Sequence, residues 1–391
     1  MRRAVVLGLA RSGEAAAALL ERNGVEVVRA DRTLGNDGDV SLLEGADVLV
    51  KSPGVPRDNP IVCAARVPIW SEVELGYRLL PNPILGVTGT NGKTTTAEWL
   101  GAIFRAAGRA VAVAGNVGRA LSGVQAPAET WIVCELSSFQ LEDVHEFRPR
   151  VAVLINLEPD HLDRHGTIEA YRDAKLRIFE NQTGEDTAIV PRAFGRIPGR
   201  ARQVEFSVAD PLPAEPGLPG AHNRENAAAA TAAARAAGIP DDAIAEALRS
   251  FPGVAHRLEL VAEIGGVRYV NDSKATNTAA ARRALAAYAA PLHVILGGSR
   301  KGEAYDELAG ELRGRAYLIG ETAGELAEAL DRAGVPYVSC GDLATAVAAA
   351  SRAAAPGDVV LLSPACASYD QFRDFEHRGE EFRRLVQNLS G

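Results

Sequence analysis

The sequence contains few cysteines and no long apolar run. Its four cysteines, Cys63, Cys134, Cys340 and Cys366, lie far apart and form no C-x-x-C pair. This pattern indicates neither a disulfide framework nor a zinc site. It instead indicates a protein of the reducing cytosol. No run of 18 apolar residues occurs, and Arg11 interrupts the apolar stretch near the N-terminus. We expect a cytoplasmic protein with no membrane span, no signal peptide and no membrane partner.

An excess of positive charge is also missing. Lys and Arg number 42 against 50 Asp and Glu, which gives a formal net charge of −8. A general nucleic-acid binder needs a basic surface to replace counterions, so we expect no nucleic-acid partner. What is present is a chain of 391 residues with 47% hydrophobic content. That length is enough for two or three domains, each with its own core.

The stretch at 84–100, ILGVTGTNGKTTTAEWL, has the order strand, glycine loop, helix. The glycines allow several N–H groups to point at one anion, and the helix N-terminus adds its positive end. Lys93 can reach the outer phosphates of a nucleotide, and the Thr94 hydroxyl can ligate Mg²⁺. Val87 stands where the strict phosphate-loop pattern has glycine, so the loop is a variant. A surface turn is the alternative, but the flanking strand and helix favour nucleotide binding.

Residues 1–80 are predicted to alternate between strands and helices, and they imitate a dinucleotide-binding unit. We expect strands at 4–7, 25–30 and 48–50, a turn at 8–13 and a helix at 14–22. Asp31 ends the second strand, where an acid bonds a ribose hydroxyl in such units. Ala10 replaces the glycine that lets the backbone approach a pyrophosphate, so NAD is disfavoured. A nucleotide-sugar site is favoured, with a purely structural βαβ unit as the alternative.

A carboxylate and a histidine follow apolar strands in the segment after Pro83. Glu135 ends the run at 131–135, where phosphate-loop enzymes place an acid that helps to hold Mg²⁺. His161 follows the strand at 151–157 and stands among carboxylates. An acid after a strand is commonly only solvated, and a single His is more often structural than a ligand. Their place beside the Lys93 loop favours the metal role for Glu135.

Lys175 lies on the apolar stripe of a helix expected at 168–180, together with Ile168, Tyr171 and Ile178. Desolvation there would lower its pKa, and a neutral amine can react with CO₂ to give a carbamate, an anionic metal ligand. The alternative is a side chain whose stem is packed while its charged head stays in water. Periodicity alone favours that alternative.

Residues 191–221 are rich in Pro and Gly and are expected to be mostly loop. A long alanine helix up to Gly238 follows, and near its start Asn223 and Asn226 lie three residues apart, so both can face one ligand. Capping of the helix is the rival role. From about 253 we expect four further strands, each followed by a polar loop, which make a second doubly wound sheet. These strands are at 267–270, 293–296, 316–319 and 359–362.

Taken together, these motifs resemble the Mur ligases, the ATP-dependent amino-acid ligases of peptidoglycan synthesis. TGTNGKTT, ELSSFQLE, DHLDRH, AHNRENA, HRLE and NDSKATN stand in the order found in that family. The stretch LLSPACASYDQFRDFEHRGEEF resembles the member that joins D-glutamate to UDP-N-acetylmuramoyl-L-alanine. The resemblance implies an α/β fold of three domains. These are a Rossmann-like UDP-substrate-binding domain (1–81), a central phosphate-loop ATP-binding domain (82–253) and a Rossmann-like amino-acid-binding domain (254–391).

The resemblance also implies a reaction and its cofactors. ATP would phosphorylate the carboxylate of UDP-N-acetylmuramoyl-L-alanine, and the amine of D-glutamate would attack the resulting acyl phosphate. Two Mg²⁺ ions are expected, one held by Thr94 and Glu135 and the other by His161 and a carbamylated Lys175. The resemblance thus reverses the preference that periodicity gave at Lys175. We expect the enzyme to be a monomer.

The remaining site residues are carried over from the family motifs and fall into four groups. The catalytic group is Lys93, Glu135, His161, Lys175 and Arg257. ATP would be bound by Gly89, Thr90, Asn91, Gly92, Lys93, Thr94, Thr95, Asn223, Asn226, Arg257 and Asp272. The UDP-bearing substrate would be bound by Arg11, Ser12, Asp31, Arg32, Gly54, Asn116 and His161. D-glutamate would be bound by Thr276, Lys301, Ser368 and Phe375.

Three other functions compete with this interpretation. A sibling Mur-type ligase or a folylpolyglutamate-type synthetase is the nearest alternative, and assays over different amino acids and acceptors distinguish them. A non-catalytic nucleotide-dependent switch would keep the phosphate loop but would need neither Lys175 nor Lys301. A dehydrogenase is disfavoured by Ala10.

Overall fold

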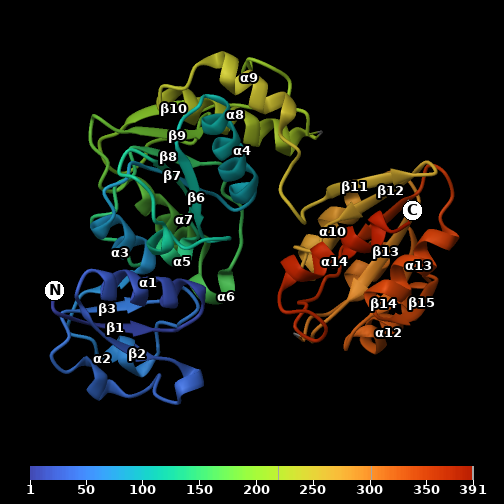
Figure 1. The fold of residues 1–391 in the computed structure, drawn as a ribbon, viewed down its shortest axis with the longest axis horizontal. Helices are drawn as coiled ribbons and strands as arrows, with labels where there is room; N and C mark the ends of the chain where they lie inside the picture. Colours follow the sequence, from blue (N-terminus) through green and yellow to red (C-terminus); the bar gives the residue numbers. More distant parts are fainter. Residues whose placement is uncertain (219, 301, 390–391) are drawn as a thin grey trace. The chain divides into compact units, whose positions relative to one another are not determined.

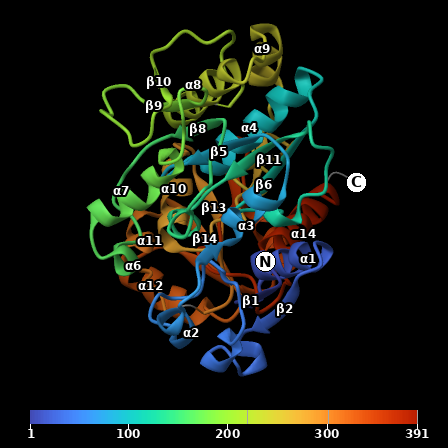
Figure 2. The same ribbon diagram turned by 90° about the vertical axis from the view of Figure 1, so that its left-hand side faces the viewer.

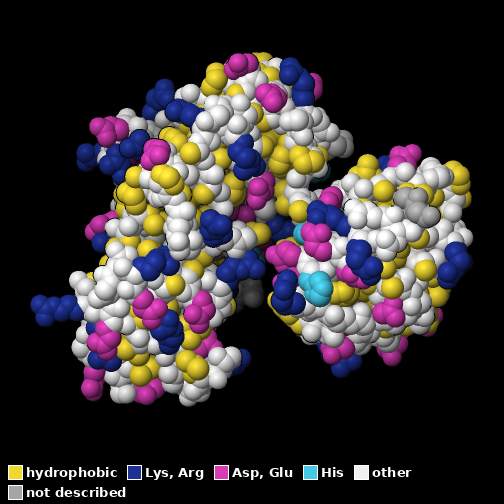
Figure 3. Space-filling model, in the orientation of Figure 1, with side chains coloured by type: hydrophobic (Ala, Val, Ile, Leu, Met, Phe, Trp, Pro, Cys, Tyr) yellow, Lys and Arg dark blue, Asp and Glu magenta, His cyan; other side chains and the backbone are white. Residues whose placement is uncertain are grey.

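A computed structural model describes residues 1–218, 220–300 and 302–389, with the backbone alone described at 162 and 163. The chain divides into two compact units, Met1–Phe251 and Pro252–Gly391. Both units are built from parallel or mostly parallel sheets covered by helices (Figure 1). On the face shown in Figure 3, acidic and basic side chains are interspersed over each unit, in keeping with the small net charge.

The first sheet has the strand order β2-β1-β3-β4, with every pair parallel. One part of its core includes Ala4 and Val6 of β1 packed with Ala16 and Leu20 of α1. The helix α1 begins at Arg11, three residues before the predicted start, because Ala10 already has the extended backbone of an N-cap. The elements are β1 Arg3–Leu7, α1 Arg11–Arg22, β2 Glu26–Ala30, β3 Val48–Lys51, α2 Pro60–Ala64, β4 Ile69–Ser71 and α3 Glu72–Leu79.

The middle sheet has six parallel strands in the order β10-β9-β8-β5-β7-β6. Its strands are β5 Ile84–Thr88, β6 Val111–Gly115, β7 Trp131–Glu135, β8 Val151–Leu154, β9 Thr187–Pro191 and β10 Arg202–Phe206. Its helices are α4 Lys93–Ala106, α5 Ser138–Leu141, α6 Leu162–His165, α7 Ile168–Leu176, α8 Ala221–Ala236 and α9 Asp241–Ser250. Because β5 lies between β7 and β8, the chain changes direction across the sheet there, and open α/β sheets bind ligands at such points.

Three helices pack together on the middle sheet. The helices α4, α8 and α9 lie against one another in both ribbon views (Figures 1 and 2). Trp99 of α4 is fully buried, donates its indole N–H to the Ala247 carbonyl at 3.3 Å and stacks on Phe251 with ring centroids 5.0 Å apart. These contacts hold α4 against α9, and the phosphate loop leads directly into α4.

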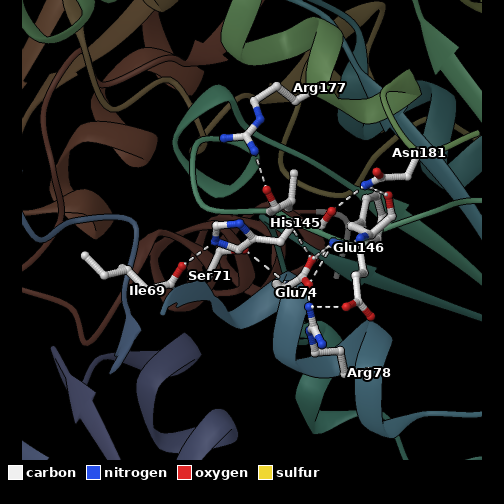
Figure 4. Close-up of polar contacts among 10 residues, drawn as sticks. Ile69, Ser71, Glu74, Arg78, His145, Glu146, Arg177 and Asn181 are labelled. Carbon is white, nitrogen blue, oxygen red and sulfur yellow. Dashed lines mark hydrogen bonds and ion pairs between the residues drawn. The ribbon is translucent and has the colours of Figure 1, made fainter. Parts of the chain in front are cut away.

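The helix α3 attaches the first sheet to the middle sheet. Glu74 has no exposed surface, and its carboxylate accepts the backbone N–H groups of His145, Glu146 and Phe147 at 2.9, 2.9 and 3.0 Å. Arg78, one turn later, donates to the same carboxylate at 2.7 Å (Figure 4). A carboxylate held by three successive amides and a guanidinium is a charge-assisted anchor, which explains why both sheets belong to one compact unit.

The second unit contains a six-stranded sheet in the order β11-β12-β16-β13-β14-β15. The pair β11 and β12 is antiparallel, and the other pairs are parallel. Its strands are β11 Glu259–Ile264, β12 Val267–Asn271, β13 Leu292–Gly297, β14 Gly314–Ile319, β15 Tyr337–Gly341 and β16 Val359–Leu362. Its helices are α10 Thr278–Ala286, α11 Asp306–Glu311, α12 Ala323–Ala333, α13 Leu343–Ala353 and α14 Phe375–Gln387.

Some predicted elements were wrong or missing. The segment 191–221 contains the strand β10, although a loop was expected, and the helix expected at 168–180 ends as α7 at Leu176 and continues as a 3₁₀ turn. The strand β10 is RQVEF, and Phe206 is its one buried residue, so its apolar pattern is weak. The strand β11 was missed even though the two-residue Gly265-Gly266 connection is a hairpin signal. No helix of the described residues is both long and apolar enough to cross a membrane.

Candidate active site

The phosphate loop follows β5 and leads directly into α4. Gly92 has a φ of +81°, and a Cβ added there would lie 2.1 Å from Oδ1 of Asn226 in α8. Only glycine therefore fits, because a side chain would be strained and would collide with Asn226. The predicted nucleotide residue Asn226 is 4% exposed and lies directly against the loop. Asn223, one turn earlier in α8, is partly buried.

Residues that follow β8 hold the loop in shape. Oδ1 of Asn156 accepts the backbone N–H groups of Thr90 and Asn91 at 3.1 and 2.9 Å. The Thr90 hydroxyl bonds the backbone of Glu158 at 3.1 Å, and the Asn91 side chain donates to the Glu158 carboxylate at 2.8 Å. The turn is therefore fixed before any nucleotide binds, and a phosphate that uses those two amides has to displace Asn156.

Two lysines converge on one carbonyl of this loop. Nζ of Lys93 donates to the carbonyls of Gly89 and Thr90 at 3.0 and 2.9 Å, and Nζ of Lys175 donates to the Gly89 carbonyl at 2.8 Å. Lys175 is 1% exposed, so its head does not reach water and the snorkelling alternative is wrong. Burial, reinforced by the nearby charge of Lys93, lowers the pKa of Lys175 to about 7.

Tyr171 connects Lys175 to the loop. The ammonium of Lys175 lies 4.6 Å from the centroid of the Tyr171 ring, and the Tyr171 hydroxyl is 3.1 Å from the Thr90 hydroxyl. Burial raises the pKa of Tyr171 to about 12, so its hydroxyl stays protonated. An aromatic face stabilises a nearby ammonium less strongly than a carboxylate would. The amine of Lys175 is thus buried, ordered and easily deprotonated.

Glu135 lies at the carboxyl end of β7 and is 3% exposed. Its Oε1 accepts the side-chain N–H of Asn116 at 3.0 Å. The structure thus brings together a residue predicted for the metal and a residue predicted for the UDP-bearing substrate. Glu135 also exerts an electrostatic pull on Lys175, opposing the fall in the pKa of that lysine.

His161 lies just after β8 and is about half exposed. Its backbone has a φ of +50°, and its Nε2 is 3.6 Å from the Asp160 carboxylate. Its ring contacts Phe139 of α5, with centroids 4.9 Å apart. A histidine held in the left-handed backbone region at an exposed edge is an unusual feature, and such strain is concentrated at functional sites.

The residues predicted in the first sheet lie just after the strands β1, β2 and β3. Arg11 is the first residue of α1 and donates to the Gly118 carbonyl at 2.9 Å, while Ser12 follows it. The Asp31 carboxylate accepts the N–H of Leu9 at 2.6 Å and the N–H of Thr33 at 2.8 Å, and these bonds lower its pKa. Asp31 therefore shapes the loop after β1. Arg32 is exposed, and an added Cβ on Gly54 would meet no atom within 4 Å.

A second set of polar groups lies at the strand ends of the second unit. Asp272 follows β12 and is 5% exposed. It accepts the Ser363 hydroxyl at 2.8 Å and the N–H of Leu258 at 3.2 Å. Burial raises the pKa of Asp272 to about 6, against the opposing hydrogen bonds and the charge of Arg257. This carboxyl group is thus half protonated near pH 6.

A buried arginine, Arg378, ties together the loops in which some of the residues predicted for the amino acid lie. Arg378 has no exposed surface and donates to the carbonyls of Ser273, Cys366 and Ala367 at 2.8 to 3.3 Å. Burial lowers its pKa to about 10. These bonds join the loop after β12 to the loop after β16. The partly buried Thr276, the buried Ser368 and the partly buried Phe375 lie in or beside these loops, and Lys301 lies outside the described residues.

Comparison with known proteins now identifies the family. Residues 87–197 match the Mur ligase middle domain, and residues 256–366 match the Mur ligase glutamate ligase domain. A protein of Acidobacterium capsulatum named UDP-N-acetylmuramoylalanine–D-glutamate ligase is 42% identical over 98% of this chain and 96% of its own length. The chain belongs to the Mur ligase family. A second protein of that name, from Pelotomaculum thermopropionicum, is 42% identical over 99% of this chain and 98% of its own.

Solved structures of Mur ligases and their relatives share the fold. The UDP-N-acetylmuramate-alanine ligase of Thermotoga maritima aligns over 100% of both chains with a TM-score of 0.63 at 19% identity. A folylpolyglutamate synthase/dihydrofolate synthase of Yersinia pestis, solved with AMPPNP and a Mn ion, covers 82% of this chain and 92% of its own. Its TM-score is 0.57 at 21% identity. The mixed α/β fold with parallel sheets is thereby confirmed.

The donors of this Mur ligase fit a hard divalent cation that is also bound to phosphate. Among the described residues, no group of three or more His, Cys, Asp or Glu side chains is arranged to hold a metal by itself. The buried carboxylate of Glu135 and the hydroxyl of Thr94, at the start of α4, are nevertheless oxygen donors beside the phosphate loop. Mg²⁺ is usually held by one or two such donors together with phosphates and water, so the residues fit.

Sequence reasoning missed several residues of the site. Asn156 and Phe139 were not singled out, although one holds the loop amides and the other contacts His161. Arg378, which joins the loops after β12 and β16, was also missed. Asn156 directly follows an apolar strand, and that position was a usable signal. The partner of Phe139 comes from a distant segment, so its role is visible only in the structure.

Proposed function

We propose that this protein ligates D-glutamate to UDP-N-acetylmuramoyl-L-alanine with hydrolysis of ATP to ADP and phosphate. The proposal places the reaction in the cytoplasm, where it makes a peptidoglycan precursor and so supports the cell wall, cell shape and cell division. The observation that carries the proposal is the pair of lysines that share the Gly89 carbonyl of the phosphate loop. The names of relatives 42% identical over nearly the whole chain supply the substrates.

The proposed chemistry proceeds in two steps. An oxygen of the acceptor carboxylate attacks the γ-phosphorus of ATP. The bond between the γ-phosphorus and the oxygen that bridges it to the β-phosphate breaks, ADP departs, and an acyl phosphate of the acceptor is formed. The amine of D-glutamate then attacks the acyl carbon, loses a proton, and the C–O bond breaks with release of phosphate. Carboxylate is a poor electrophile, so phosphorylation supplies the leaving group. The protein contributes alignment and charge neutralisation.

Each site residue has a role in this proposal. Lys93 and the start of α4 hold the phosphates, and Asn226, which contacts the loop, supports the nucleotide together with Asn223. Thr94 and Glu135 hold one Mg²⁺, and His161 and a carbamylated Lys175 hold a second. When bound, these ions neutralise the charge that builds up on the transferred phosphoryl group. The near-neutral pKa of Lys175 supports the carbamate, because only a neutral amine reacts with CO₂.

The remaining roles follow the three proposed domains, with boundaries at 1–81, 82–253 and 254–391. The first domain binds the UDP end of the acceptor through Arg11, Ser12, Asp31, Arg32 and Gly54, with Asn116 and His161 of the central domain. The third domain contributes Arg257 and Asp272 to the nucleotide and binds D-glutamate through Thr276, Lys301, Ser368 and Phe375. We propose that the enzyme acts as a monomer and that a hinge near 252–255 closes this domain over ATP. Scattering with and without nucleotide and acceptor tests the closure, and unchanged dimensions would exclude it.

Phosphate release screened over acceptors and amino acids tests the function. We expect release from ATP to require UDP-N-acetylmuramoyl-L-alanine together with D-glutamate. Release with another amino acid or with a folate acceptor would instead support a sibling ligase or a folylpolyglutamate-type enzyme. The latter alternative has a specific basis, because the folylpolyglutamate synthase fold covers 82% of this chain. Release that depends on neither substrate would favour a nucleotide switch.

A further inference from the structure

The loop that follows β3 is held from the middle sheet at three points. We call residues 52–59 the β3 loop; it contains Gly54. At its base, Nζ of Lys51 lies 2.9 Å from the Asp143 carboxylate. In its middle, a guanidinium nitrogen of Arg164 donates to the Val55 carbonyl at 3.3 Å. Farther along, Nε of Arg57 lies 3.3 Å from the Glu142 carboxylate.

Arg164 differs from Lys51 and Arg57 because it also contacts the aromatic ring that packs on His161. Its guanidinium carbon lies 4.0 Å from the centroid of the Phe139 ring. The same ring contacts His161, three residues before Arg164, at 4.9 Å, and it stacks on His165 at 5.2 Å. One side chain therefore joins Val55, beside the proposed UDP-substrate residue Gly54, to the aromatic ring that packs on the proposed catalytic residue His161.

Arg164 has few other side-chain contacts among the described residues. The Val55 carbonyl and the Phe139 ring are its described side-chain partners, and no carboxylate of the described side chains is within ion-pair distance. Arg164 and Arg57 also line a cavity of about 530 Å³ with Glu142 and His165. Because Arg164 borders open space, shortening it does not require a packed core to rearrange.

We propose that Arg164 is a positioning residue that sets the distance between the two binding ends of the acceptor. This rests on the proposed function, in which the UDP end binds near the β3 loop and the carboxylate end reacts near His161. A long substrate that is bound at one end reacts at the other end only if the distance between the two binding sites matches its length. A displacement of the reacting group by about 1 Å can lower the rate on the order of 100-fold. Neither ATP nor D-glutamate spans these two ends.

Steady-state kinetics of Arg164→Ala, Arg164→Leu and Arg164→Lys test the proposal. For Arg164→Ala and Arg164→Leu, we expect kcat/KM for the acceptor to fall by about 10- to 100-fold. The KM values for ATP and D-glutamate should stay within about twofold. Arg164→Lys should recover most of the loss, because it keeps a cation over Phe139 and one donor for Val55. A merely structural role would not produce this selectivity for one substrate.

Arg172→Ala is the matched control. Arg172 is exposed on the neighbouring helix α7, and its guanidinium lies 5.7 Å from the Phe194 ring, so it is also an arginine over a phenylalanine. We expect its three KM values and its kcat to match the parent protein. Thermal unfolding of every variant reports whether the fold survives.

Two results would overturn the proposal for Arg164. One is an unchanged kcat/KM for the acceptor in Arg164→Ala. The other is recovery in Arg164→Leu, because that would assign the effect to packing rather than to the cation. A parent protein without D-glutamate-dependent phosphate release would instead contradict the proposed function itself. If Arg164→Ala does not fold, the contrast between the leucine and lysine variants still decides.

Discussion

Two lysines of this Mur ligase have the same burial and opposite surroundings. Lys51 ends β3 at the junction with the middle sheet and is 2% exposed, and its ammonium lies 2.9 Å from the Asp143 carboxylate. Lys175 is 1% exposed, and its ammonium meets the Gly89 carbonyl and the Tyr171 ring. No carboxylate of the described side chains lies within ion-pair distance of Lys175.

The difference separates a structural cation from a reactive amine. A buried ion pair keeps both partners charged, and removing one leaves an uncompensated charge. A buried amine without such a partner, and with Lys93 nearby, is held by weaker contacts and loses its proton easily. The surroundings, rather than the residue type, are therefore the reason that we propose Lys175, and not Lys51, as the lysine that reacts with CO₂ and serves as a metal ligand.

The largest expected effect comes from Lys175→Ala. In the proposed function the carbamate of Lys175 would give an oxygen ligand to the second Mg²⁺. Its loss should remove several kcal/mol of transition-state stabilisation, so turnover should fall by about 1000-fold. Acetate or formate should restore part of the activity by supplying a carboxylate in the space left by the side chain. The measurement is phosphate release with both substrates. Acetate should not stimulate Lys51→Ala, and equal stimulation of both variants would remove the distinction.

The second effect concerns stability and should appear at the other lysine. Lys51→Met leaves Asp143 without its partner and should lower the free energy of unfolding by about 3 kcal/mol. The double variant Lys51→Met with Asp143→Leu should recover much of this loss. Lys175→Met should cost less than Lys51→Met at pH 6, because it removes a buried charge that lacks a carboxylate. Urea unfolding followed by tryptophan fluorescence suits this test, since Trp70, Trp99 and Trp131 all lie in the first unit. A greater loss in Lys175→Met would contradict the comparison.

The third effect is a dependence of stability on pH that Lys175 should produce. Its pKa is about 7 in the folded protein and about 10.4 when unfolded, so between these values the unfolded chain binds one more proton. The free energy of unfolding therefore rises with pH in that range. Relative to Lys175→Met, the parent protein should gain about 3 kcal/mol between pH 7 and 9.5 in CO₂-depleted buffer. A constant difference between the two proteins would show that Lys175 has an ordinary pKa.

The smallest effect extends the comparison to a buried carboxyl group in the second unit. The pKa of Asp272 is about 6, above the unfolded value, so the folded protein binds the extra proton between those values. Stability of the second unit should thus fall as pH rises. Relative to Asp272→Asn, the loss should be about 2 kcal/mol between pH 4.5 and 6.5. Hydrogen exchange of β12 and β16 measures it, and parallel pH profiles would contradict the assignment.

Much of this arrangement was predictable from sequence because it is local. The phosphate loop, Glu135 and His161 each follow an apolar strand, and parallel strands bring their carboxyl ends to one sheet edge. The stripe of Tyr171 and Lys175 likewise follows from helical periodicity. These parts of the fold and site required no knowledge of distant contacts.

The parts that were not predictable depend on contacts between distant segments. Whether the head of Lys175 reaches water depends on the Gly89 loop, which lies 86 residues earlier in the chain. The pairing of Lys51 with Asp143 and the place of Arg164 between Val55 and Phe139 are equally remote. The strand β10 was missed for a different reason, because its sequence RQVEF has too few apolar residues to form a pattern.

The most direct test is ¹³C NMR of the protein in ¹³C-labelled bicarbonate at pH 8. The comparison of the two lysines predicts a carbamate resonance in the parent protein that persists in Lys51→Met and disappears in Lys175→Met. A spectrum without that resonance, or one in which it survives the replacement of Lys175, would contradict the assignment of Lys175 as the reactive amine.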